Sequence, residues 1–148
     1  MLIETVRFGV IDIDDARIIE FRDGVLGFPK HKRFALVQTS TDPVFFWLQS
    51  VDDPQLAFVV CDPLAFVSDY HCPIKDDDRS ALNMRDERDC QMLIIVNKVD
   101  GQLTGNLLGP LVIGASSLIG RQMVLSDKRY TTRHRLMESR PAPLAMTA

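Results

Sequence analysis

The sequence has few cysteines, no long apolar run and no leader-like start, and each shortage excludes a class of protein. Its three cysteines, Cys61, Cys72 and Cys90, are odd in number and scattered, so we expect no disulfide framework. No apolar run approaches the ~20 residues that cross a bilayer. The N-terminus lacks a basic segment followed by an uninterrupted apolar one, so we predict no signal peptide and expect a cytoplasmic protein.

Recognisable metal and catalytic motifs are also missing. A zinc site built from Cys61, His71 and Cys72 would lack the usual C-x-x-C spacing, and Cys61 is better explained as a small apolar core residue. The acidic run 76–78 lacks the alternating ligands of a calcium loop. No serine lies in G-x-S-x-G, and no glycine-rich run resembles a phosphate loop. We therefore predict no metal, cofactor or catalytic residue, and only an enzyme site assembled in three dimensions stays open.

Length and charge set further bounds. A chain of 148 residues forms one domain with a sizeable core. The net charge is −3, which argues against broad binding to nucleic acid, because such binding depends on Lys and Arg neutralising phosphates. We therefore expect no direct nucleic-acid partner and no membrane partner.

The most informative stretch that is present runs from residue 43 to residue 63. The Asp-Pro pairs at Pro54 and Pro63 bracket the apolar segment 56–61, and a proline interrupts strand pairing because it lacks an N–H. Upstream, alternation places Phe46 on the face opposite Phe45 and Trp47. Two adjacent strands that are apolar on both faces belong at the centre of an all-β domain. Their core positions are expected to include Leu56, Phe58, Val59 and Val60.

The rest of the chain fits the same fold class. Apolar alternation and turn residues predict ten short strands, at 1–8, 10–13, 18–21, 33–38, 44–50, 56–61, 91–98, 103–108, 111–113 and 120–125. Residues 65–72 are expected to be extended, and at most one short helix is expected within 76–89. We predict a small single-domain β-barrel or sandwich over residues 1–136. Residues 137–148 are expected to form a disordered tail.

One motif pair suggests a nucleotide sensor. The R-x-x-x-R run from Arg129 to Arg133 and the S-x-x-G run from Ser117 to Gly120 resemble parts of the PilZ-like barrels that bind a cyclic dinucleotide. Their order is reversed here, and Ala115 stands where that family has an acidic or amide residue. A PilZ-like β-barrel that binds a cyclic dinucleotide therefore stays open as an alternative function.

A second resemblance covers nearly the whole chain. Six stretches occur in order at family-like spacing: F-x-x-G-V-L-G-F (21–28), F-x-L (34–36), W-L-Q-S-x-D-D-P-x-L-A-F-V-V-x-D-P (47–63), N-L-L-G-P-L-V-I (106–113), G-R-Q-x-V-L (120–125) and R-Y-x-x-R-H (129–134). On these motifs the chain resembles the flagellar assembly factor FliW family. It departs from the family pattern at Gly105, Gly109 and Arg135, and its tail beyond Glu138 matches nothing in that pattern.

The resemblance implies a non-catalytic cytoplasmic β-barrel. Members of this family bind the RNA-binding translational regulator CsrA and relieve its repression of flagellin synthesis, and flagellin competes as the second partner. Within the matching stretches, polar and turn residues are the candidates for partner contact: Gln49, Asp52, Asp53, Gln55, Asp62 and Asn106. Each also has a purely structural explanation, because Asp, Asn and Asp-Pro are common in turns that have no partner.

Overall fold

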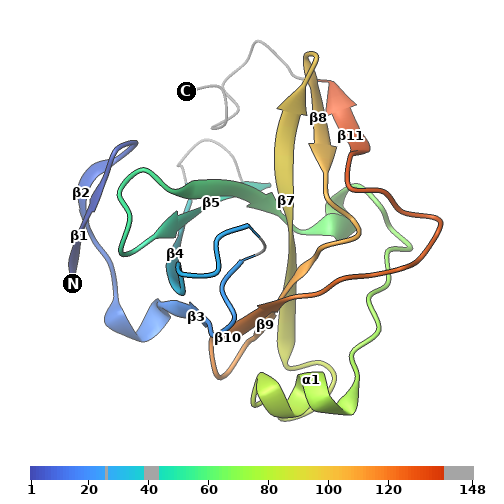
Figure 1. The fold of residues 1–148 in the computed structure, drawn as a ribbon, viewed down its shortest axis with the longest axis horizontal. Helices are drawn as coiled ribbons and strands as arrows, with labels where there is room; N and C mark the ends of the chain where they lie inside the picture. The colour runs from blue at the N-terminus through green and yellow to red at the C-terminus, as the bar shows by residue number, and fades with distance from the viewer. Residues whose placement is uncertain (26, 39–43, 139–148) are drawn as a thin grey trace.

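The chain folds into a β-barrel with a small N-terminal hairpin beside it (Figure 1). The computed structural model describes residues 1–25, 27–38 and 44–138. The strands are β1 (Leu2–Thr5), β2 (Gly9–Asp12), β3 (Ile19–Phe21), β4 (Arg33–Val37), β5 (Phe45–Ser50), β6 (Ala57–Cys61), β7 (Cys90–Val99), β8 (Gln102–Gly105), β9 (Leu111–Gly114), β10 (Ile119–Gln122) and β11 (His134–Glu138). The helices are α1 (Asp76–Ala81) and the 3-10 turns η1 (Asp15–Arg17) and η2 (Pro63–Ala65).

The barrel closes through β7. The main sheet has the order β11-β8-β7-β6-β5-β4-β3-β10-β9, and an additional pairing between β7 and β9 joins its two ends into a ring. Neighbouring strands are antiparallel except β3 and β10, which run parallel. The predicted all-β barrel is therefore confirmed.

Two apolar cores lie on the two faces of the central strands. The barrel core fills the interior with side chains from six barrel strands: Ile19, Phe21, Phe34, Leu48, Val60, Leu93, Leu111 and Ile113. The outer core lies on the other face and contains Phe45, Trp47, Val59, Cys61 and Ile94. The partly buried ring of Phe46 packs against the barrel core, opposite Phe45 and Trp47 as alternation predicted. Strands β5 and β6 thus contribute to both cores.

The N-terminal hairpin forms a separate two-stranded sheet, with Leu2 opposite Asp12 and Thr5 opposite Gly9. Its tip docks against the barrel next to β5. The Val6 N–H donates to the Pro54 carbonyl at 2.9 Å. The Arg7 guanidinium lies 4.2 Å from the centre of the Trp47 ring, a cation–π contact. The hairpin therefore braces the turn between β5 and β6.

Several expected bounds of secondary-structure elements were wrong, and for one of them a local hydrogen bond gives the reason. Residues 65–72 do not form a strand, because the Asp62 carboxylate accepts the Leu64 N–H at 2.9 Å and starts η2 at Pro63. Strand β8 ends at Gly105 instead of residue 108, and β10 ends at Gln122 instead of residue 125.

The C-terminal boundary also differs from the expectation. Strand β11 pairs Met137 with Leu103 and Glu138 with Gln102, so the domain end expected at residue 136 falls inside a strand. The rest of the expected tail, 139–148, lies outside the described residues. Within the part of the chain that the structure describes, no helix has the length and apolar character needed to cross a bilayer.

The core assignment of β6 is correct only for its second half. Val59 and Val60 are buried, whereas Leu56 and Phe58 are half-buried, because they lie at the turn end of the strand. The Phe58 ring packs between Phe28 and Phe34, with ring centroids 5.6 Å and 6.2 Å away.

These burials predict different mutational costs. Phe34→Ala, which empties a fully buried site in the barrel core, should lower the free energy of unfolding by about 3–5 kcal/mol. Phe58→Ala should cost only about 1–2 kcal/mol, because part of its ring already contacts water. Urea unfolding curves measure both values, and an equal loss in the two variants would contradict the difference in burial between Phe34 and Phe58.

Candidate functional site

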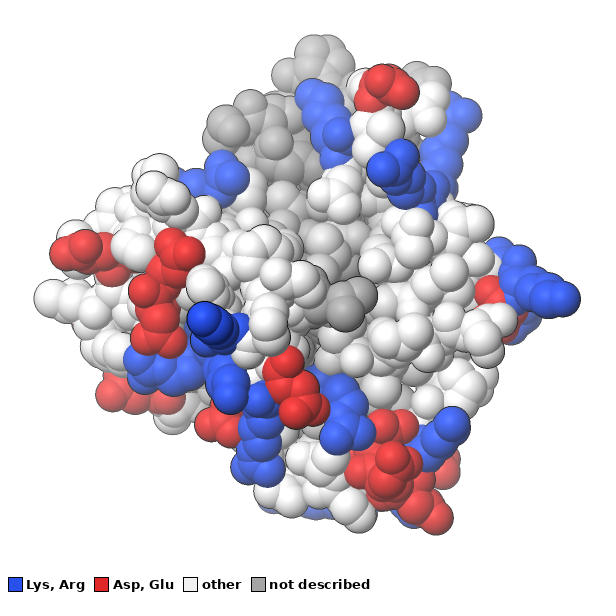
Figure 2. All heavy atoms as spheres, in the orientation of Figure 1, with Lys and Arg blue, Asp and Glu red and all other residues white. Residues whose placement is uncertain are grey.

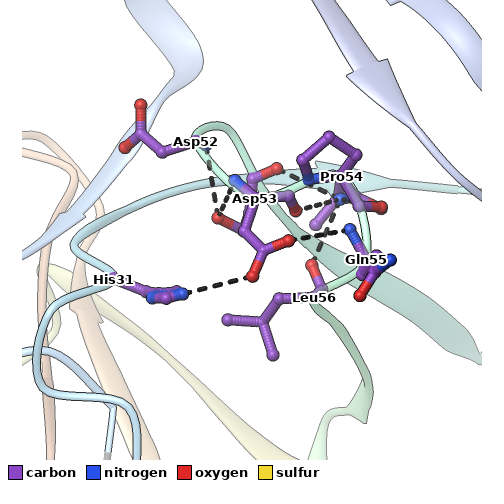
Figure 3. Close-up of polar contacts among 8 residues, drawn as sticks. His31, Asp52, Asp53, Pro54, Gln55 and Leu56 are labelled. Atoms are coloured by element: carbon purple, nitrogen blue, oxygen red, sulfur yellow. Dashed lines mark hydrogen bonds and ion pairs between the residues drawn. The ribbon is translucent and has the colours of Figure 1, made fainter.

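Four of the six candidate residues lie close together: Asp52, Asp53 and Gln55 in the β5–β6 turn (residues 51–56; Figure 3), and Gln49 near the end of β5. The Ser50 hydroxyl accepts the Asp52 and Asp53 N–H groups at 3.3 Å and 3.0 Å. The Asp53 Oδ1 accepts the Gln55 N–H at 3.0 Å. The Ser50 N–H donates to the Leu56 carbonyl at 2.9 Å and closes the reversal. The S-x-D-D-P sequence therefore builds its own turn.

Gln49 is not a surface residue, which corrects its place among the contact candidates. Its side chain is fully buried, with 0% exposed. The Nε2 group lies 3.1 Å from the carbonyls of both Ser50 and Leu56 and 3.3 Å from that of Asp53. Gln49 therefore holds the turn from inside. Alternation contained the signal for this, because it places Gln49 on the same face of β5 as the outer-core residues Phe45 and Trp47.

The two aspartates of the turn contact two side chains, Arg33 and His31, that the sequence did not connect with it. The Arg33 guanidinium lies 2.6 Å from Asp52. His31 Nε2 lies 3.3 Å from Asp53 Oδ2, as Figure 3 shows. The hydrogen bond from Arg33 lowers the pKa of Asp52 below its usual range. Both partners precede the turn by about twenty positions in the sequence, and no motif connects them to it. The Asp52 carboxylate is thus paired with a guanidinium, while the Asp53 carboxylate contacts His31 and accepts the Gln55 N–H.

The surface next to the turn carries both signs of charge. A shallow hollow of about 480 Å³ is lined by Glu20, Arg22, Lys30, Lys32, Arg33 and Asp52. Figure 2 shows acidic and basic groups interleaved on the left and lower parts of the view, while the centre right is largely uncharged. The arrangement is typical of the rim of a protein–protein interface, where charges steer encounter and set register.

The remaining two candidates lie elsewhere. Asp62 is exposed at the opposite end of β6 from Gln55, on the order of 20 Å away by the rise per residue of a strand. Asn106 is half-buried after β8, where its Oδ1 accepts the Leu108 and Gly109 N–H groups at 3.1 Å and 3.0 Å. The structure therefore does not bring the six candidates into one site.

The residues considered for other chemistry have structural roles. Burial raises the pKa of Cys61 to about 12 and that of Cys72 to about 11, the opposite of what activates a nucleophile. Among the described residues, no group of three His, Cys, Asp or Glu is placed to hold a metal ion. Of the PilZ-like residues, Ser117 donates to the Leu82 carbonyl and Arg129 pairs with Asp127 at 2.8 Å.

Gln49 gives a direct test of how the turn is held. Gln49→Ala should lower the free energy of unfolding by about 1–3 kcal/mol, because it removes the buried amide that donates to the Ser50, Asp53 and Leu56 carbonyls. The exposed residue Gln55 is the control, since Gln55→Ala should change stability by less than about 0.5 kcal/mol. Chemical denaturation with a two-state fit measures both values. An unchanged free energy of unfolding in Gln49→Ala would show that Gln49 does not stabilise the turn.

Asp52 predicts a pH dependence. Its folded-state pKa lies below the unfolded value, so its pairing with Arg33 adds stability above the unfolded pKa and loses it as the pH falls through the folded pKa. Asp52→Asn should therefore cost less than about 1 kcal/mol at pH 7, as is usual for an exposed pair, and nothing near pH 2. Thermal melts of the wild type and of Asp52→Asn from pH 2 to pH 7 test this. A stability difference between them that grows as the pH falls would contradict the prediction.

Comparison with known proteins gives consistent results. The family model described as "FliW protein" matches residues 2–136. The flagellar assembly factor FliW of Magnetococcus marinus is 36% identical over 140 residues, which cover 93% of this chain and 85% of the relative. The flagellar assembly factor FliW of Heliobacterium modesticaldum is 38% identical over 138 residues, which cover 92% of this chain and 90% of the relative.

A solved structure agrees with the sequence matches. The crystal structure of a flagellar assembly factor FliW superposes with a TM-score of 0.84 at 33% identity, over 93% of this chain and 97% of that one. Both the fold and the sequence therefore match along nearly the full length, and this chain belongs to the FliW family of flagellar assembly factors.

Proposed function

We propose that this chain acts in the cytoplasm as a non-catalytic regulator of flagellin synthesis. In this proposal it binds the translational regulator CsrA and relieves repression of flagellin translation. Flagellin competes with CsrA for binding to this chain. The chain itself binds no RNA. The observation that carries the proposal is the match to the FliW family over residues 2–136, which spans the complete barrel.

The chemistry of the molecule supports a binding protein. Burial raises the pKa of the Cys61 and Cys72 thiols and keeps them protonated. The polar side chains Asp53, Asp62 and Asn106 of the family-like stretches form hydrogen bonds within turns and caps. An overall charge of −3 disfavours RNA and suits a partner that binds RNA through basic groups. Such a partner can present cations to carboxylates on this chain.

Within this proposal the β5–β6 turn is the contact for basic groups of the partner. Asp52 and Gln55 are exposed and Asp53 is half-buried on one reversal, which is held by hydrogen bonds from the buried Gln49 amide and from the N-terminal hairpin. The turn needs little ordering on binding, so little conformational entropy is lost there. Asp62 and Asn106 lie outside this surface and act as caps of η2 and of the 106–109 turn.

The functional proposal is tested by competition between purified proteins. Size-exclusion chromatography at micromolar concentration should show this chain co-eluting with CsrA and with flagellin separately, and added flagellin should displace CsrA. A gel shift with flagellin leader RNA should show no binding by this chain alone, because it lacks an excess of cations. Failure to co-elute with either protein at low and moderate salt would refute the proposal.

A matched pair of variants locates the contact. Asp53 and Asp62 share one structural role, since each carboxylate accepts the N–H two residues further on, at 3.0 Å and 2.9 Å; Asp53 in addition contacts His31 at 3.3 Å. Asp53→Ala and Asp62→Ala should thus lose similar stability, about 0.5–2 kcal/mol. Only Asp53→Ala should weaken CsrA binding, by about fivefold, as expected for a rim charge. Calorimetric titration measures this, and equal affinities would exclude the turn as the contact.

A further inference from the structure

The hollow beside the β5–β6 turn has the opposite sign of charge to the molecule as a whole. Its lining consists of four cations and two carboxylates, and we call these six residues the basic hollow: Arg22, Lys30, Lys32, Arg33, Glu20 and Asp52. The chain as a whole carries a net charge of −3. A partner that complements this surface must therefore bring negative charge to it.

Two of the four cations are free to meet that charge. The two arginines of the hollow are paired with its two carboxylates, at 2.9 Å and 2.6 Å. Among the described residues, Lys30 and Lys32 form no ion pair and no side-chain hydrogen bond. The carboxylates of the hollow are thus already occupied, and two ammonium groups are left for a partner.

Backbone hydrogen bonds fix the frame that carries these groups. The Phe21 N–H at the end of β3 donates to the Lys32 carbonyl at 2.7 Å, immediately before β4 begins. The Val51 N–H donates to the Arg33 carbonyl at 2.9 Å and ties the start of β4 to the β5–β6 turn. The two sides of the hollow are therefore joined before any partner arrives, which lowers the entropy lost on binding.

The hollow and the turn share one residue, Asp52. Its side chain lines the hollow, and its backbone belongs to the turn that the proposed function assigns to CsrA. Figure 3 shows the Asp52 carboxylate directed away from the contact between Asp53 and His31. A protein seated in the hollow covers Asp52, so it excludes a second protein from that part of the turn.

Charge favours flagellin over CsrA as the occupant of the hollow. CsrA binds RNA, and the proposed function places its basic groups on the carboxylates of the turn. Two free ammonium groups repel such groups. Flagellin, as the competing partner, has to bind where it blocks the turn, and the hollow is the adjoining surface of opposite sign. RNA fits less well, because Glu20 and Asp52 interrupt the row of cations that a phosphate backbone would follow.

We propose that an acidic segment of flagellin docks in the basic hollow, with its carboxylates on Lys30 and Lys32, and displaces CsrA by covering Asp52. The inference rests on the proposed function and adds to it a site for the second partner. Competition then arises because two surfaces of opposite charge overlap at one residue. The carboxylates of the turn stay the contact of CsrA.

The test reverses the two free charges of the hollow. The double variant Lys30→Glu with Lys32→Glu breaks no ion pair among the described residues, so its melting temperature should stay close to that of the wild type. Its affinity for purified flagellin, measured by calorimetry, should fall by about tenfold or more. Its affinity for purified CsrA should stay the same or rise. Flagellin should no longer displace CsrA from the variant at a concentration that suffices for the wild type.

Two controls make the result specific. The double variant Lys30→Arg with Lys32→Arg keeps both charges and should bind flagellin within about twofold of the wild type. Lys98→Glu reverses an exposed charge on β7, outside the hollow, and should leave both affinities unchanged at physiological salt, where charges act over about 8 Å.

The outcomes separate this inference from the proposed function. An unchanged flagellin affinity in the double Glu variant overturns the inference and leaves the functional proposal standing. An equal loss of flagellin and CsrA binding also overturns it, because the hollow would then not distinguish the two partners. A wild type that binds neither protein refutes the proposed function itself. A wild type that shifts flagellin leader RNA, with the shift lost in the double Glu variant, would assign the hollow to nucleic acid and overturn the inference.

Discussion

The barrel depends on a single ten-residue strand that has to pair with three others. The first residues of β7 pair with β9, from Cys90 with Gly114 to Leu93 with Leu111. Its middle pairs with β6, and its last residues, up to Val99, pair with β8. Only because β7 changes neighbours along its length can the sheet close into a ring and also extend outward to β8 and β11. Closure removes most free edges, and free edges are what a sheet protein must otherwise protect.

Burial on both faces of β5 and β6 leaves little room for polar chemistry within the strands. The polar residues of the family-like motifs are therefore placed at the ends of strands, where they satisfy backbone groups that the ladders leave open. This gives each of them two roles. The Asp52 and Asp53 carboxylates shape the turn and at the same time present charge to the solvent, and only mutation pairs with equal structural cost can separate the two.

The sequence predicted the fold class, the strands of the central sheet and the facing of Phe46, because apolar alternation reflects burial directly. It missed the interior position of Gln49, although alternation with Trp47 indicated it, because polarity was taken to mean exposure. The contacts of His31 and Arg33 with the turn could not be predicted, since they join the start of β4 to the turn after β5 and depend on the register between these two strands.

The parallel pairing of β3 with β10 has a consequence for how the protein is made. Glu20 and Ile119 pair across 99 positions of the chain (119 minus 20). Contacts of such long range form late and slow folding, because the intervening loop has to close first. During synthesis at roughly 5–20 residues per second, β3 waits on the order of 5–20 s for its partner strand to emerge from the ribosome. Until then the barrel is an open sheet, so the ring can close only after the chain has been translated beyond β10.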